Sequence, residues 1–166
     1  SVNLEALTSE GQKNIAGIQG TLFSETITSQ AIMDSLLMPR MLALAERAWA
    51  APVALDRQSA ASLASSHAIA WSVFVHQLGL KVLPKLDQEL KGVAYRLAPP
   101  GVRIQQGLVH VNHELPGVQI RYTTDGAAPV VRSPLVMGPL PYSASLKFAA
   151  FAANGRASRA VSLEAP

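Results

Sequence analysis

The chain has 166 residues, and its content of 49% hydrophobic and 15% charged residues is typical of a globular protein and excludes a disordered one. It contains no cysteine, which excludes disulfides and thiolate metal sites, and no apolar run near the roughly 18 residues that a membrane span needs. The net charge of +3 is concentrated after Tyr95, but the arginines there are scattered and have few aromatic neighbours, so nucleic-acid binding is not expected.

The first predicted element, after a polar lead-in, is a strand at Ile15–Phe23. The segment is mostly apolar, which is typical of a strand covered on both faces in a parallel sheet, and Gly17 and Gly20 allow close approach of another backbone. A polar turn over residues 24–29 follows and holds Glu25. We therefore predict a strand–turn–helix unit with a carboxylate at the carboxyl end of the strand.

A long helix is predicted next, with Ser29 as its N-cap because a serine hydroxyl can accept from a free amide of the first turn. Apolar residues spaced four, three and four apart predict a single buried stripe: Leu37, Met41, Leu44 and Ala48. Pro39 lies inside this pattern and is expected to kink the helix or to split it in two. The helix is predicted to end at Trp49.

A second helical region follows. Its apolar residues repeat at four, three, four and three: Ala64, Ala68, Trp71, Val75 and Leu78. Gly79 is predicted to cap its end, and Pro84–Leu90 is predicted to form a short helix with Gly92 just beyond it. Trp49 and Trp71 lie on apolar stripes and are both predicted to be core residues.

The composition changes at Y-R-L-A-P-P-G, residues 95–101, after which the helical period does not return. Alternating runs separated by turn signals predict strands at Val102–Gln105, Leu108–Asn112, Val118–Thr124, Ser145–Ala152 and Ser158–Leu163. In the third run, Val118, Ile120 and Tyr122 share one face. Several short strands at this spacing favour a small antiparallel sandwich.

Three motifs carry a further signal. Residues 17–25 read G-I-Q-G-T-L-F-S-E, and P-R and A-E-R-A-W follow in the predicted helix. Residues 92–97 read G-V-A-Y-R-L, and residues 121–129 read R-Y-T-T-D-G-A-A-P. In this order they resemble the last barrel strand and helix, the join and the closing-domain hairpin of glycoside hydrolase family 20, the β-N-acetylhexosaminidases and chitobiases. The family pattern for the first motif is roughly G-x-Q-x-x-L-W-S-E.

The resemblance implies an α+β fragment. Residues 1–50 would hold the last strand and helix of a (β/α)8 barrel, residues 51–94 a helical connector, and residues 95–166 an immunoglobulin-like sandwich. A barrel strand without its neighbours exposes unpaired backbone, so we expect residues 15–23 to pair with another copy, to pack irregularly on their own helix or to be poorly ordered. The expected partners are the remainder of the barrel, or a second copy joined through this orphan strand.

The resemblance also implies a function. The family removes terminal N-acetylhexosamine from chitobiose-type oligosaccharides, and the acetamido oxygen of the sugar attacks its own anomeric carbon, so no enzyme nucleophile, metal or cofactor is needed. Glu25 matches the glutamate that accepts hydrogen bonds from the sugar hydroxyls. Phe23 stands where the family usually has a tryptophan lining the pocket. The catalytic Asp-Glu pair is absent from this sequence, so the chain alone is expected to be inactive. A periplasmic or secreted location is expected from the family, although residues 1–5 carry no signal sequence.

Other interpretations stay open at this stage. Glu25 could be a solvated carboxylate near a helix start, and Phe23 could be an ordinary core ring. The histidines lack the one-turn spacing and the third ligand of a metal site. The chain could instead be a stand-alone carbohydrate-binding or structural interaction module built on the β-sandwich, in which Tyr122 and Tyr142 stack on sugars.

Overall fold

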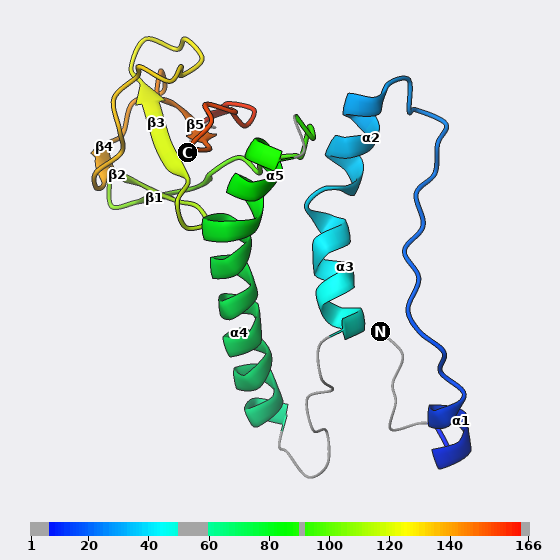
Figure 1. Ribbon diagram of the computed structural model, residues 1–166. Helices are drawn as coiled ribbons and strands as arrows, with labels where there is room; N and C mark the ends of the chain where they lie inside the picture. Colours follow the sequence, from blue (N-terminus) through cyan, green and yellow to red (C-terminus); the bar gives the residue numbers. More distant parts are fainter. Residues whose placement is uncertain (1–6, 50–59, 90–91, 164–166) are drawn as a thin grey trace.

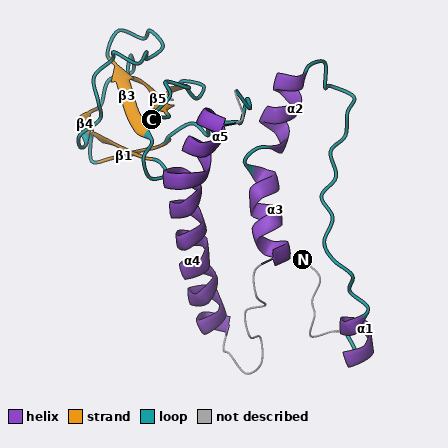
Figure 2. Ribbon diagram, viewed as in Figure 1, coloured by secondary structure: helices purple, strands orange, loops and turns teal. Residues whose placement is uncertain are grey.

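The computed structural model describes residues 7–49, 60–89 and 92–163, and its helices precede its strands along the chain (Figure 1, Figure 2). The helical elements are α1 (Ser9–Lys13), α2 (Gln30–Leu37), α3 (Arg40–Trp49), α4 (Ala60–Gln77), the π-helical turn η2 (Leu78–Val82) and α5 (Leu83–Glu89). The strands are β1 (Gly101–Gln105), β2 (Leu108–Asn112), β3 (Gln119–Thr123), β4 (Leu140–Pro141), β5 (Lys147–Phe151) and β6 (Val161–Ser162). Within the described ranges, every helix is too short or too polar to cross a membrane.

The segment predicted as a strand, residues 15–23, forms no strand in this chain (Figure 1). A strand is defined by backbone hydrogen bonds to a neighbour, and none of the described strands pairs with this segment. It runs irregularly and lies close to its own helix. A Cβ built on Gly20 would be only 2.9 Å from Cδ2 of Leu44 in α3. This irregular course agrees with one of the three outcomes expected for an orphan strand, packing on its own helix, while pairing with a second copy stays a prediction.

The predicted split of the next helix is confirmed. The Ser29 hydroxyl caps α2 by accepting from the Ile32 amide at 3.3 Å, and Pro39 separates the end of α2 from the start of α3. The predicted burial of its stripe is wrong, since no residue of α2 or α3 is buried. Trp49 ends α3 as predicted, but it is 89% exposed and is not a core residue. The described residues therefore cover only part of the apolar face of these helices.

The second helical region is longer than predicted. Gly79 does not end α4; it is buried inside η2, and the helical course continues through α5. A Cβ at Gly79 would collide with the carbonyl oxygen of Pro116, so this glycine permits close packing and does not act as a cap. Pro84 lies in the first turn of α5 and Gly92 has a φ of +102° beyond its end, as predicted. Leu90 lies outside the described residues. Val75 and Leu78 are buried, whereas Trp71 is half exposed, so its assignment to the core is wrong.

The second half of the chain forms two three-stranded antiparallel sheets, ordered β1-β2-β4 and β3-β5-β6. A shared core fills the space between them, centred on Val109, Leu146 and Phe148. Ile120 and Tyr122 of β3 both pack on this core, so their predicted placement on one face is confirmed. Five predicted strands are present, although β6 is shorter than expected, and β4 was missed because two residues carry no readable period.

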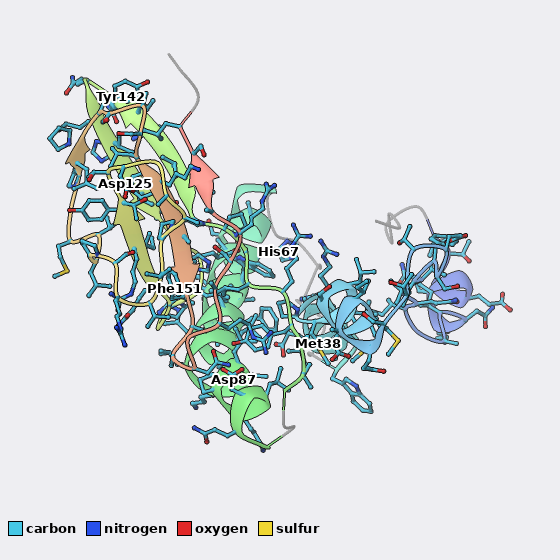
Figure 3. All side chains as sticks on the ribbon, turned by 90° about the horizontal axis from the view of Figure 1, so that it is seen from above. Met38, His67, Asp87, Asp125, Tyr142 and Phe151 are labelled. Carbon is cyan, nitrogen blue, oxygen red and sulfur yellow. The ribbon has the colours of Figure 1, made fainter. Side chains whose placement is uncertain are left out.

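A second core cluster joins the two halves of the molecule. Its buried residues come from η2, α5 and the segment that follows: Leu78, Leu83, Leu86 and Tyr95. Met38 and Leu42 pack on it from the α2–α3 side, and Leu115 packs on it from the loop after β2. Figure 3 shows Met38 on the side of α2 and α3, with Asp87 on α5 across from it. The helices and the β region are therefore connected through side-chain packing as well as through the chain.

Candidate functional site

Glu25 lies in the turn between the irregular segment and α2, where the sequence placed it. The Ile27 amide donates to the Ser24 carbonyl at 3.0 Å, which closes this turn, and the Ser29 cap follows directly. Glu25 is exposed, and Phe23 two residues earlier is 74% exposed. Among the described residues, no side chain hydrogen-bonds the Glu25 carboxylate. Glu25 and Phe23 are therefore two exposed side chains that lie two residues apart in the sequence.

These two side chains have the chemistry of a ligand-contact site. An ionised carboxylate accepts hydrogen bonds at two oxygens, and such charge-assisted bonds are stronger than neutral ones. A phenylalanine ring offers an apolar face but no polar handle. The interpretation of Phe23 as a core ring is wrong for this chain, because it is largely in solvent. The described residues also contain no group of three or more metal-ligating side chains.

A separate groove of about 780 Å³ lies between the helices and the loop after β2. Trp71 and Phe74 of α4 line it, with ring centroids 5.4 Å apart. Two hydrogen bonds join residues that line this groove. The Trp71 indole N–H donates to Glu114 Oε1 at 2.6 Å, and His113 Nδ1 accepts from the Leu115 amide at 3.0 Å. The Trp71–Glu114 bond was not predicted, since no local pattern connects α4 with the loop after β2. It holds that loop on α4, whereas the His113–Leu115 bond lies within the loop.

The segment between α5 and β1, residues 92–97 and here called the join, is hydrogen-bonded on two sides. On the α2 side, the Ala94 amide donates to Asp34 Oδ2 at 3.1 Å and the Arg96 amide donates to the Met38 carbonyl at 3.0 Å. On the β side, Arg156 Nη2 donates to the Val93 carbonyl at 2.9 Å. The join is therefore fixed to α2 and to the turn after β5 at the same time.

Tyr95 occupies the centre of the join and is 2% exposed. Its hydroxyl donates to Asp87 Oδ2 at 3.1 Å, and the Arg156 guanidinium carbon lies 4.4 Å from its ring centroid. Burial, reinforced by the negative charge of Asp87, raises the pKa of Tyr95 to about 12. The phenol therefore stays neutral at physiological pH and serves as a hydrogen-bond donor.

Comparison with known proteins accounts for both halves of this arrangement. Residues 2–52 match the catalytic domain of glycosyl hydrolase family 20, and residues 82–160 match the chitobiase/beta-hexosaminidase C-terminal domain. The chain is 33% identical over 140 residues to a beta-hexosaminidase of Vibrio vulnificus, an alignment covering 74% of this chain and 16% of that protein. It is 29% identical over 123 residues to the N,N'-diacetylchitobiase of Vibrio harveyi, covering 69% of this chain and 14% of that protein.

A third similar protein is a beta-N-acetylhexosaminidase of Cellulomonas fimi, 32% identical over 59 residues, which are 36% of this chain and 12% of that protein. The chain thus spans less than a fifth of the length of the curated relatives that it matches. Part of a glycosidase catalytic domain precedes a β domain in a single chain. The chain belongs to glycoside hydrolase family 20, the β-hexosaminidases and chitobiases, as the motifs at residues 17–25, 92–97 and 121–129 indicated.

Proposed function

We propose that this chain is the carboxy-terminal part of a β-N-acetylhexosaminidase that removes terminal non-reducing N-acetylhexosamine from chitobiose-type oligosaccharides. The observation that carries the proposal is the order of the two family matches, a catalytic-domain segment at residues 2–52 followed by a C-terminal domain at residues 82–160. The names of the relatives from Vibrio support this substrate class. Catalysis in the whole protein is substrate-assisted and retaining, and the location is periplasmic or secreted.

In this proposal, residues 1–50 supply the last strand and helix of a (β/α)8 barrel, and residues 51–94 form the connector. The orphan segment 15–23 becomes a strand when the rest of the barrel supplies its neighbours, which agrees with its apolar sequence and its exposed side chains. Residues 95–166 form an immunoglobulin-like sandwich. Two antiparallel sheets packed around one core support that assignment.

Glu25 binds hydroxyls of the non-reducing-end sugar, and Phe23 lines the same pocket. The exposed carboxylate in a turn directly before α2 supports this role, because functional side chains of α/β barrels gather at the carboxyl ends of the strands. No Asp-Glu dipeptide occurs in the chain, so the general acid and the acetamide-orienting group come from elsewhere in the protein. The chain by itself does not hydrolyse the substrate.

The stand-alone carbohydrate module is less well supported. Tyr122 and Tyr142, the rings that motivated it, both pack against the core cluster of Val109, Leu146 and Phe148. Titration of the chain with chitin oligosaccharides would restore this alternative if it showed binding that survives removal of Glu25.

The test uses the full-length protein that contains this chain and an aryl N-acetyl-β-glucosaminide. The wild type is expected to release the aryl alcohol, and Glu25→Gln to lower kcat/KM by about 10- to 100-fold through loss of charge-assisted hydrogen bonds. Glu46→Gln, an exposed carboxylate on α3, is the matched control and is expected to leave kcat/KM unchanged. A wild type without activity on this substrate would refute the proposal. A Glu25→Gln enzyme with wild-type kinetics would remove Glu25 from it.

A further inference from the structure

The contacts on the join carry an inference about how the turn of Glu25 is held. Arg156 reaches the join from a turn that is itself rigidly built. Its backbone amide donates to Asn154 Oδ1 at 2.9 Å, its carbonyl accepts from the Ala152 amide at 2.9 Å, and Gly155 supplies the positive φ that this turn requires. The guanidinium is therefore presented from a fixed point at the end of β5.

From this point Arg156 makes two different contacts with the join. Its Nη2 donates to the Val93 carbonyl, and its guanidinium covers the ring of Tyr95. The flat cation suits both tasks, since it can stack on a ring while one edge remains available for hydrogen bonding. Tyr95 is held on its other side by Asp87 of α5. The join is thus clamped between the β domain and α5.

On the opposite side, Asp34 connects the join to the beginning of α2. Its Oδ2 accepts from the Ala94 amide, and its Oδ1 accepts from Gln30 Nε2 at 2.7 Å. Gln30 is the first residue of α2 and directly follows the Ser29 cap. One carboxylate therefore ties the join to the helical turn that begins five residues after Glu25.

We propose that Arg156 and Asp34 are positioning residues for Glu25, through which the C-terminal domain fixes the start of α2 and hence the carboxylate that holds the sugar. The proposal rests on the proposed function for the role of Glu25. The path runs from Arg156 to the join, from the join to Asp34, and from Asp34 to Gln30. Neither positioning residue touches the sugar, and each acts by restricting where the Glu25 turn can lie.

This role predicts a particular kinetic signature in the full-length enzyme. Loosening the turn weakens the hold of Glu25 on the sugar in the ground state and the transition state alike, so KM rises while kcat and the pH profile of kcat stay unchanged. We expect Arg156→Ala to raise KM about three- to tenfold. Arg156→Lys, which keeps the positive charge but loses the planar guanidinium, should raise KM by less than Arg156→Ala does but still above the wild-type value. Arg159→Ala removes an exposed arginine three residues away and is the matched control, with an unchanged KM.

A double-mutant cycle separates positioning from a general structural effect. If Arg156 acts through Glu25, then Arg156→Ala should raise KM little further once Glu25→Gln has removed the carboxylate. If the double variant instead raised KM by the product of the two single-variant factors, the proposal would be wrong. Asp34→Asn, which keeps one acceptor oxygen where the carboxylate has two, provides a second variant from the other end of the path and should show the same non-additivity.

A measurement on the 166-residue chain keeps this test independent of activity. Hydrogen exchange of the Ile32 and Met33 amides, both in the first turns of α2, should become several-fold faster in Arg156→Ala than in the wild type and in Arg159→Ala. Unchanged exchange at these amides would overturn the positioning role even if the full-length enzyme is active. Conversely, an inactive wild-type enzyme would refute the proposed function and leave the exchange result to decide the connection between Arg156 and α2.

Discussion

The β domain and the segment from α1 to α3 differ sharply in what covers their apolar residues. Val109 and Phe148 are fully buried between the two sheets, whereas no residue of α1, α2 or α3 is buried. In the N-terminal region, large apolar side chains face solvent instead: Ile15, Ile18, Leu22, Phe23, Ile32, Met41 and Trp49. Both regions have apolar sequences, so composition does not explain the difference.

The difference lies in where each element finds its partner. β1 pairs with β2 across a two-residue turn, and β5 pairs with β3 and β6, so that each of these strands finds its partner within the β domain. Residues 15–23 have no such neighbour among the described residues. An apolar strand from a parallel sheet depends on distant strands for its backbone hydrogen bonds, whereas antiparallel hairpins supply their own. The strands of the β domain therefore find their partners among the described residues, and residues 15–23 do not.

The largest expected effect is seen when a phenylalanine ring is removed from each region in turn. Phe148→Ala should lower the free energy of unfolding of the 166-residue chain by about 3–5 kcal/mol, because it removes a fully buried ring and leaves a cavity. Phe23→Ala should change it by less than about 0.5 kcal/mol. Denaturant unfolding of both variants measures this directly. Equal losses would mean that Phe23 is buried in solution and that the contrast between the regions is wrong.

The second effect concerns Tyr95, at the boundary between the regions. Its pKa is about 12 in the folded chain, against an ordinary value of 10.0. The neutral phenol therefore stabilises the fold fully below pH 10, and this stabilisation is lost as the pH rises through about 12. The two-unit difference corresponds to roughly 2–3 kcal/mol. Tyr95→Phe has no ionisable hydroxyl, so the stability advantage of the wild type over this variant should shrink between pH 10 and 12. A constant difference over that range would contradict the buried, hydrogen-bonded phenol.

A third effect tests how closely η2 packs against the loop after β2. Gly79→Ala should destabilise the chain by about 1–2 kcal/mol, because the overlap with the backbone carbonyl of Pro116 outweighs the better helix propensity of alanine. Gly138→Ala is the control, since nothing lies within 4 Å of its added Cβ. Thermal unfolding of the two variants separates these outcomes. A stabilised Gly79→Ala variant would show that the loop after β2 moves away at little cost.

The features predicted correctly from the sequence are those fixed by local chemistry. Ser29 caps α2, Pro39 separates two helices, and turn signals such as Gln106-Gly107 delimit the β strands. The errors occur at residues whose packing is determined by segments that are distant in the sequence. Gly79 suits a helix end equally well, and only the position of Pro116 shows why a glycine is required inside the helix. Trp49 lies on a helical stripe whose covering layer is not among the described residues.

The candidate site likewise contains one part that could be predicted from the sequence and one that could not. Glu25 could be placed in its turn because the family motif is contiguous in sequence. The contacts of the join could not be predicted, since Asp34 and Ala94 are 60 residues apart and Arg156 and Val93 are 63 apart. No periodicity connects positions so far apart. The sequence thus points to the proposed sugar-binding residue while giving no sign of its proposed positioning residues.

The smallest effect tests what keeps α2 folded without a buried face. If local chemistry holds this helix, Ser29→Ala should cost about 1 kcal/mol, because it leaves the Ile32 amide without its side-chain acceptor. That loss should speed exchange of the Ile32 amide about fivefold. Ser35→Ala, within the same helix, is the control and should not speed exchange, since alanine has the higher helix propensity. The cap would then act beside the contacts of Asp34 and Met38 with the join. An Ile32 amide that does not respond to Ser29→Ala would mean that the cap adds nothing and that those distant contacts alone stabilise α2.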